Sequence, residues 1–324
     1  MIEASRTLDQ LGYGRSLAQP RTPPTAGEWD ALEGMAKTLT STGFYRVIRR
    51  FQRRERYSVA TSDNARQGLY VDVETTGLDV ELDSIIELAV VPFEFDRDGV
   101  VYEVGEPVVF FEDPGRPIPP EITSLTGITD DMVRGQRIDD AVIAAILKQS
   151  VIVIAHNAEF DRKMLERRIP AFADIGWGCS QRDIPWAQFG CSGTKLEYLL
   201  FRACGEFHDG HHAADDCLAA IHLLANAHVN ARPALAFLLD SARQSTVRLW
   251  AIGAPFDTKD RLKARKYRWS PGDNNRPKAW FRDLLHSDVD AEQAWLRENI
   301  YAGHSSPPWR LEEFGAKDRY STRV

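Results

Sequence analysis

The segment that most constrains this chain is Leu69-Tyr70-Val71-Asp72-Val73-Glu74-Thr75-Thr76-Gly77. Its first half predicts a strand in which Asp72 and Glu74 share one face, while Val73 is buried behind them. The turn that follows, Thr75-Thr76-Gly77, is expected to expose hydroxyls and a backbone amide beside both acids. A solvent-facing acidic strand edge would explain the alternation, but it would not explain the polar segments found further along.

The second polar segment is His156-Asn157-Ala158-Glu159-Phe160-Asp161. It follows a buried strand predicted over 151–155, so Asp161 is expected in the first turns of a helix, facing back towards the strand end. Taken alone, the segment is an ordinary helix start with Asn157 as its cap. The segment indicates a functional site only in combination with the other two polar segments.

The third polar segment runs from His211 to Asp216, at the start of a helix predicted over 212–227. A histidine beside a metal-bound water can accept its proton near neutral pH, because the unperturbed pKa of histidine is about 6.5. A single histidine at a helix start is more often structural. The neighbouring His212 and Asp215 leave the local assignment open on spacing alone.

If the fold brings four acids together, their charges cannot stay uncompensated; the acids in question are Asp72, Glu74, Asp161 and Asp216. Two like charges about 4 Å apart repel by about 4 kcal/mol at an effective dielectric near 20. The acids must therefore protonate, spread apart or hold divalent cations, and oxygen ligands suit Mg²⁺ or Mn²⁺. The pattern predicts a metal-dependent hydrolase that acts on phosphate esters.

The composition is that of a globular protein with a hydrophobic core: 43% of the 324 residues are hydrophobic and 10% are aromatic. No apolar run approaches the length of a membrane span, and residues 1–14 lack the apolar centre of a signal peptide. We therefore expect a cytoplasmic protein that does not engage a membrane. The four cysteines are 12 or 13 residues apart, which favours reduced, mostly buried thiols over a zinc site or disulfides.

Charge is distributed unevenly beneath the net value of −7. Residues 67–244 hold 29 acids against 14 bases, residues 1–66 hold 7 against 11, and residues 245–324 hold 11 against 15. An acidic centre between basic flanks fits a metal-loaded catalytic core whose flanks help to hold a polyanion. Ordinary scatter of surface charge explains the flanks equally well.

The chain is expected to contain three parts: an N-terminal basic helical extension (1–66), an α/β domain (67–244) and a small α+β module (245–324). The extension should carry a helix over 28–56, whose arginines form either a solvated face or a phosphate-contacting patch. In the α/β domain we expect strands over 69–74, 85–95, 100–104, 108–111 and 151–155, and helices over 139–149, 159–168, 195–203, 212–227 and 233–243.

In this order and spacing the three polar segments resemble the DEDDh 3′–5′ exonucleases, the proofreading-exonuclease (DNA polymerase III epsilon subunit-like) family. The resemblance covers about 67–228 and includes Asp-x-Glu-Thr-Thr-Gly, His-Asn-x-x-Phe-Asp and His-x-Ala-x-x-Asp. The segment from Ile118-Pro119 to Leu125-Thr126-Gly127-Ile128-Thr129 is similar to the family's connecting loop. The resemblance implies a ribonuclease H-like fold, with a mixed central sheet flanked by helices.

The resemblance also implies roles for residues. The four acids would hold two Mg²⁺ or Mn²⁺ ions, and His211 would be the general base because the family's histidine lies five residues before its last aspartate. A tyrosine-type relative would carry tyrosine where this chain has His212. The residues implied to bind or support the substrate end are Thr75, Thr76, Gly77, Leu78, His156, Asn157 and Phe160. Of these, Phe160 would pack near the terminal base, whereas His156 and Asn157 would support the site rather than perform chemistry.

The implied activity is two-metal-ion hydrolysis that releases nucleoside 5′-monophosphates from DNA 3′ ends, in proofreading or repair. Single-stranded or frayed 3′ ends are the implied partners, and a DNA polymerase or repair protein is a candidate partner. One alternative is an RNA 3′-end trimming exoribonuclease, because the motifs do not distinguish deoxyribose from ribose. Another is a catalytically silent nucleic-acid-binding scaffold, which would not need four acids and His211 intact.

The module over 245–324 combines bases with aromatic residues, notably over 256–269 and 277–281. It weakly resembles small modules found beside nucleic-acid enzymes, which carry a Leu-Lys-x-x-x-x-x-Trp…Lys-x-Trp pattern. The aromatic residues could stack on bases, or they could form the module's own core. We expect Trp250 and Trp280 in the core and leave Trp269 open. Deleting 245–324 should then weaken substrate binding while metal-dependent cleavage of short oligonucleotides persists.

Overall fold

The computed structural model describes residues 25–58, 64–208, 210, 212–272, 276–304 and 306–324. The chain divides into two units, Met1–Ile48 and Arg49–Val324. The three-part division expected from the sequence places its first boundary elsewhere, at residue 66, and stays a prediction. We describe each unit by itself.

The described part of the first unit contains helix α1 (Ala26–Ser41). The helix begins at a capping box in which the Glu28 carboxylate accepts from the backbone N–H and the hydroxyl of Thr25. The prediction of a helix over 28–56 is wrong beyond Ser41. Gly43 follows with a φ of +75°, a conformation that stops a helix, and the chain beyond it is extended.

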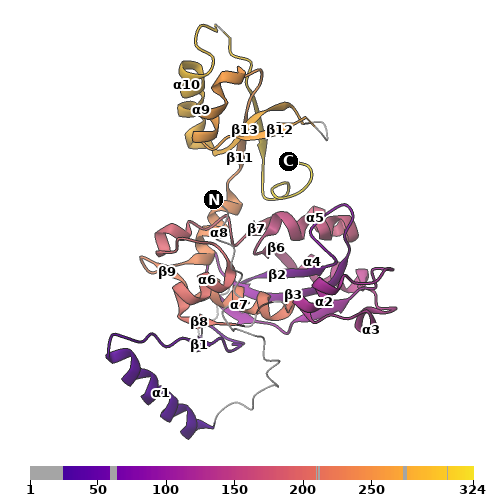
Figure 1. Ribbon diagram of the computed structural model, residues 1–324, viewed down its shortest axis with the longest axis vertical. Coiled ribbons are helices and arrows are strands. Elements are labelled where there is room, and N and C mark those ends of the chain that lie inside the picture. The colour runs from indigo at the N-terminus through magenta and orange to yellow at the C-terminus, as the bar shows by residue number, and fades with distance from the viewer. Residues whose placement is uncertain (1–24, 59–63, 209, 211, 273–275, 305) are drawn as a thin grey trace, which may run out of the picture. The chain divides into compact units, whose positions relative to one another are not determined.

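The second unit is built on a six-stranded mixed sheet (Figure 1). Its strands are β2 (Arg66–Thr75), β3 (Ile85–Phe95), β4 (Val101–Val104), β5 (Val108–Phe111), β6 (Ser150–Ala155) and β7 (Trp177–Cys179). They are ordered β4-β3-β2-β6-β7, with β5 also paired to β3. The central strand β2 runs antiparallel to β3 and parallel to β6. The antiparallel half of the sheet and its parallel half therefore meet at β2, the strand that carries Asp72 and Glu74.

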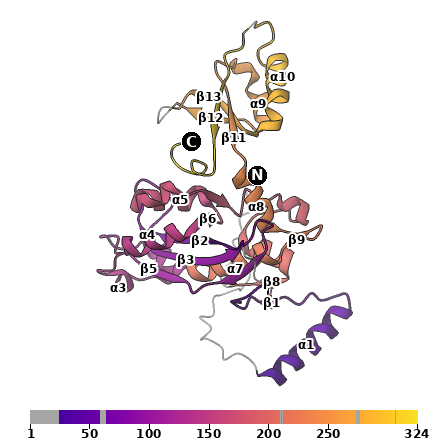
Figure 2. The same cartoon turned by 180° about the vertical axis from the view of Figure 1, so that it is seen from behind.

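Helices cover both faces of this sheet (Figure 2). Because side chains alternate along β2, Tyr70 packs with α7 (Ala213–Asn226) and α8 (Ala234–Arg243), while Leu69 and Val71 pack with α4 (Asp140–Gln149) and α5 (Ala158–Arg168). The short helices are α2 (Pro120–Thr126), α3 (Asp130–Val133) and α6 (Leu196–Leu199). This architecture confirms the predicted ribonuclease H-like exonuclease fold class.

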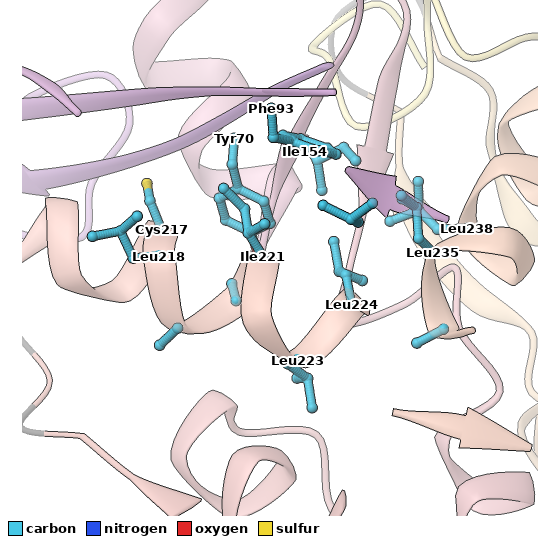
Figure 3. Packing of buried hydrophobic residues seen from close by; sticks show 14 of the residues in the cluster. Tyr70, Phe93, Ile154, Cys217, Leu218, Ile221, Leu223, Leu224, Leu235 and Leu238 are labelled. Atoms are coloured by element: carbon cyan, nitrogen blue, oxygen red, sulfur yellow. The ribbon is translucent and has the colours of Figure 1, made fainter. Parts of the chain in front are cut away.

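Helix α7 is the most deeply buried helix that touches the acid-bearing strand. Ile221 and Leu224 point from it towards Tyr70 and Ile154 of the sheet (Figure 3). The burial of these side chains fixes the rotation of α7 about its axis, and with it the position of the first turn. Two-residue strands flank the helix: β1 (Arg49–Arg50) pairs with β8 (Glu206–Phe207), and β9 (His228–Val229) pairs with β10 (Arg232–Pro233).

Residues after Gln244 form a four-stranded antiparallel sheet with two helices, the α+β module expected from the sequence. Its elements are β11 (Thr246–Ala251), α9 (Lys259–Ala264), β12 (Arg268–Pro271), β13 (Lys278–Leu285), α10 (Val289–Asn299) and β14 (Arg310–Phe314). Trp250 is fully buried and Trp280 packs against the module's core, as predicted, whereas Trp269 is 49% exposed.

Two further features concern the cysteines and the helices. The four cysteines are free thiols, and three of them are buried. Among the helices that the structure describes, none combines the length and apolar character needed to cross a membrane.

Candidate active site

The end of β2 presents the first two acids. Asp72 and Glu74 lie on the face of the sheet that α7 covers, and the pairing of β2 with β3 shifts register between Glu74 and Thr75. Such an irregularity bends a strand and re-aims its side chains. Asp216 lies in the first turn of α7, so one carboxylate oxygen from each of Asp72, Glu74 and Asp216 falls within 4.8 Å of the others.

Asp161 reaches the same place from the opposite helix layer. It lies in the first turn of α5, and its Oδ1 accepts a hydrogen bond of 3.3 Å from the backbone N–H of Val73. Pairing of β2 with β6 ends at Tyr70, so the strand edge is open at this point and the carboxylate of Asp161 occupies it. The structure therefore brings all four predicted acids to one short stretch of β2.

Burial and mutual repulsion disfavour the charged forms of these acids. The pKa of Asp72 is raised well above its usual range, mainly by burial and then by the charges of Asp161, Asp216 and Glu74. The pKa of Glu74 is raised to about 7 by burial and by the neighbouring acids, and the pKa of Asp161 is raised to about 7 mainly by burial. A divalent cation would relieve this repulsion, and a set of carboxylate oxygens suits a hard cation, so the residues fit the expected metal.

The turn after β2 differs from its prediction. Thr75 and Thr76 are buried, so the expectation that their hydroxyls are exposed is wrong. The Thr76 hydroxyl donates to Asp83 at 2.9 Å and accepts from the Ser84 N–H and the Arg116 guanidinium. A Cβ on Gly77 would lie 2.4 Å from the Asp83 carboxylate, so the turn needs glycine or a shift of that side chain. The side chain that the turn does present is Leu78, which is 86% exposed.

His156 is held in a chain of hydrogen bonds that runs from the carbonyl oxygen of Thr194 to the buried hydroxyl of Tyr70. Its Nε2 lies 2.8 Å from the carbonyl oxygen of Thr194, which can only accept, so Nε2 carries the proton and Nδ1 accepts from the Ser180 hydroxyl. Ser180 in turn accepts from the hydroxyl of Tyr70 at 2.8 Å. Burial lowers the pKa of His156, which favours this neutral ring. These contacts fix the orientation of the His156 ring, and its expected supporting role in the site stays a prediction.

Two other residues from the predicted set flank the start of α5. Asn157 occupies the N-cap position of α5 without a side-chain capping bond, so its expected capping role is not observed. The Phe160 side chain is partly buried and packs against the core that contains Leu69 and Val71. Their contact with a substrate stays a prediction.

The predicted general base, His211, lies outside the described residues. The neighbouring His212 occupies the N-cap position of α7, also without a side-chain cap. A third histidine, His208, has its Nε2 2.6 Å from Oδ1 of Asp216, and its side chain is only 5% exposed. Sequence reasoning missed His208, because nothing in its spacing from Asp216 matches a recognised motif.

A fifth acid, Glu87, was also missed. It lies opposite Glu74 in the β2–β3 pairing, and its Oε2 accepts from the backbone N–H of Ala213 at the start of α7. Burial raises the pKa of Glu87. A sequence signal did exist, since a single acid inside the apolar run Ile85-Ile86-Glu87-Leu88-Ala89 is unusual for a buried strand.

Comparison with known proteins identifies sequence relatives of the chain. A family described as "Exonuclease" matches residues 69–224. The DNA polymerase III subunit epsilon of Treponema pallidum is 31% identical over 161 residues, which are 47% of this chain and 72% of that protein. The DNA polymerase III PolC-type of Listeria welshimeri is 45% identical over 95 residues, 28% of this chain but only 6% of its own length.

Among solved structures, a zinc-bound complex of E. coli ExoI with single-stranded DNA overlaps 72% of this chain and 71% of its own. The sequence identity is 18% and the TM-score is 0.47, so this likeness carries no conclusion about the site. The sequence relatives and the family match confirm the resemblance inferred from the three motifs.

Proposed function

The chain belongs to the exonuclease family, and from this premise we propose that it is a metal-dependent 3′–5′ exonuclease that releases nucleoside 5′-monophosphates from DNA 3′ ends. The observation that carries the proposal is the convergence of Asp72, Glu74 and Asp216 within 4.8 Å, with Asp161 hydrogen-bonded to the residue between the first two. Three carboxylates gathered this closely in a partly buried place, with raised pKa values at Asp72 and Glu74, are typical of functional sites.

We propose that these four acids hold two divalent ions, Mg²⁺ or Mn²⁺. When bound, such ions activate water and stabilise the charge that develops on the attacking and leaving oxygens. The acids come from β2, α5 and α7, three elements whose buried faces fix them rigidly. The chain therefore supplies a preorganised set of oxygen ligands rather than one assembled by the substrate.

The remaining residues have supporting parts in this proposal. His211 would accept the proton of the attacking water, because it holds the position of the histidine in the family that the motifs resemble, five residues before Asp216. His208 would orient the Asp216 carboxylate through the 2.6 Å contact, and Glu87 would hold the first turn of α7 through the Ala213 N–H. The exposed side chain of Leu78 is available to the terminal nucleotide, beside the buried Thr75–Thr76 turn.

DNA is the favoured substrate because the relatives from Treponema pallidum and Listeria welshimeri are named as parts of DNA polymerase III. We therefore place the biological role in proofreading or repair, with single-stranded or frayed 3′ ends as substrate and a DNA polymerase as a candidate partner. The motifs themselves do not distinguish deoxyribose from ribose. Trimming of RNA 3′ ends is accordingly the alternative that the same experiment must test.

The test uses 5′-labelled single-stranded DNA, a duplex with a mismatched 3′ end, and RNA, each incubated with Mg²⁺ or Mn²⁺. We expect a ladder that shortens from the 3′ end, abolished by a chelator and reduced at least about 100-fold in Asp72→Ala and His211→Ala. Glu94→Ala, an exposed acid on β3, is the matched control and should cleave like the wild type. Equal cleavage by all variants would refute the site, shortening from the 5′ end would refute the polarity, and faster cleavage of RNA would favour the alternative.

A further inference from the structure

Arg162 follows Asp161 directly in α5 and is a fully buried cation. Its side chain is 0% exposed, and its guanidinium lies 5.4 Å from the centre of the Trp177 ring. Its Nε donates to the carboxylate of Glu166, one turn further along the helix. A buried guanidinium needs hydrogen-bond acceptors for all of its N–H groups, because water cannot supply them.

Most of those acceptors come from the last described residues of the chain, Ala316–Val324, which we call the C-terminal tail. Nη1 of Arg162 donates to the carbonyl oxygens of Ala316 at 3.1 Å and Arg319 at 2.7 Å, and Nη2 donates to that of Lys317 at 2.5 Å. Three carbonyl oxygens from four consecutive residues thus surround one guanidinium. Without the tail, Arg162 would keep only Glu166 as a described hydrogen-bond partner.

The tail is itself held by the exonuclease part of the chain. The Arg319 guanidinium donates to the backbone carbonyls of Ser241 and Gln244 at the end of α8. The Tyr320 hydroxyl donates to Asp183 at 2.7 Å. The tail therefore connects α5 to α8 and to the segment after β7, with most of the contacts made by polar groups that need fixed geometry.

A second connection reaches β7. The backbone N–H of Trp177 donates to the carbonyl oxygen of Ala316 at 2.9 Å, so the tail extends the open side of the last strand in the sheet. Arg323 adds an ion pair to Glu166 at 2.9 Å. Glu166 thus shares its carboxylate between Arg162 of its own helix and Arg323 of the tail.

We propose that the C-terminal tail positions Asp161 for metal binding by holding Arg162 in place, which makes Arg162 a positioning residue. This inference rests on the proposed function, in which Asp161 is a metal ligand. Neighbouring residues on a helix point about 100° apart, so the first turn of α5 is held on two sides: by Val73 through Asp161 and by the tail through Arg162. If the tail is lost, the three carbonyl acceptors that fix the Arg162 guanidinium are lost with it, and of these two contacts only the hydrogen bond between Asp161 and Val73 still holds the first turn of α5.

The coupling changes what we expect when the C-terminal module is removed. Deleting 245–324 takes the tail with it, so it should damage the metal site as well as any substrate contact. Cleavage of short oligonucleotides, which the sequence led us to expect would persist, should instead fall. The module and the exonuclease part then behave as one functional unit.

The test measures Mn²⁺ binding to the full chain by titration calorimetry, beside the Mg²⁺ concentration that gives half-maximal cleavage. Arg162→Met should weaken Mn²⁺ binding at least tenfold and raise the half-maximal Mg²⁺ concentration similarly, while kcat at saturating metal stays near the wild-type value. Arg248→Met is the matched control: Arg248 is also buried, but it pairs with Asp283 inside the module and does not touch α5. It should lower Tm without changing Mn²⁺ affinity.

A truncation after Gly315 provides a second route to the same result. In the otherwise wild-type chain, the truncation should weaken Mn²⁺ binding at least tenfold. In a chain that already carries Arg162→Met, it should weaken Mn²⁺ binding less than twofold further, because both changes remove the same contacts. If Arg162→Met does not fold, the Mn²⁺ affinity of the truncated chain tests the inference by itself. Wild-type Mn²⁺ affinity in the truncated chain, or equal losses in Arg162→Met and Arg248→Met, would overturn the inference. Absence of Mn²⁺ binding and cleavage in the unaltered chain would instead refute the proposed function.

Discussion

Replacing Glu74 with glutamine is expected to stabilise the metal-free protein while removing its cleavage. The pKa of Glu74 is raised from 4.5 to about 7, first by burial and then by Asp216, Glu87 and Asp161. Below pH 4.5 the side chain is protonated in both folded and unfolded states, so its ionisation costs nothing. Above pH 7 it is ionised in both, and the folded state is less stable by the full difference, about 3 kcal/mol at 1.36 kcal/mol per pKa unit.

The amide is neutral and close in shape, so Glu74→Gln should raise the free energy of unfolding by up to about 3 kcal/mol at pH 8 and by about 0 at pH 4. Urea unfolding at both pH values in the presence of a chelator measures the difference. Glu94→Gln, at an exposed position on the neighbouring strand, should change stability little at either pH. With saturating Mg²⁺ the order should reverse, because only the wild-type chain gains the full binding free energy. A Glu74→Gln protein that is less stable than the wild type at pH 8 without metal, or equally stabilised at pH 4, would refute the reasoning.

Three further predictions concern the core, a turn and the module. Leu224→Ala removes a fully buried side chain that faces Ile154 (Figure 3) and should lower the free energy of unfolding by about 3 kcal/mol in urea; a loss below about 1 kcal/mol would contradict the packing. Gly99→Ala should cost at least about 2 kcal/mol by the same assay, since φ is +79° and the new Cβ would lie 2.4 Å from the backbone N of Ala236; an unchanged midpoint would contradict it. Trp269→Ala should leave Tm nearly unchanged but weaken binding of long single-stranded DNA by about 1–3 kcal/mol in fluorescence anisotropy, and unchanged affinity would mean that this half-exposed ring does not stack on bases.

Local sequence was most informative where apolar periodicity was strong. The strand predicted over 85–95 is observed as Ile85–Phe95, and the helix predicted over 212–227 as Ala213–Asn226. The helix predicted over 28–56 was wrong after Ser41, where Gly43 adopts a positive φ and no buried face continues the helical pattern. Periodicity predicts an element well when burial selects its residues, and poorly when the side chains are mostly exposed.

The same limit applies to the candidate site. The acids at Asp72 and Glu74 could be paired from the sequence because two residues of one strand share a face whatever surrounds them. Their association with Asp161 and Asp216 followed from the order of the motifs. The hydroxyls expected to be exposed at Thr75 and Thr76 are instead bonded within the protein. The Thr76 hydroxyl contacts Asp83, Ser84 and Arg116, and the Thr75 hydroxyl donates to the carbonyl oxygen of Gly77.

The sequence by itself determined the strand-borne acids, the order of the three motifs and, through them, membership of the exonuclease family. Only the tertiary structure showed that His208 contacts Asp216, that Glu87 holds the start of α7, and that the tail surrounds Arg162. The last two contacts join residues 126 and 157 positions apart, and neither follows from helix or strand periodicity. His208 and Asp216 are close in sequence, but His208 precedes α7, so helical periodicity does not predict their contact. The periodicity of a helix or strand in the sequence specifies which face of that element a side chain occupies. Which distant residue the side chain contacts depends on how the helices and the sheet pack together.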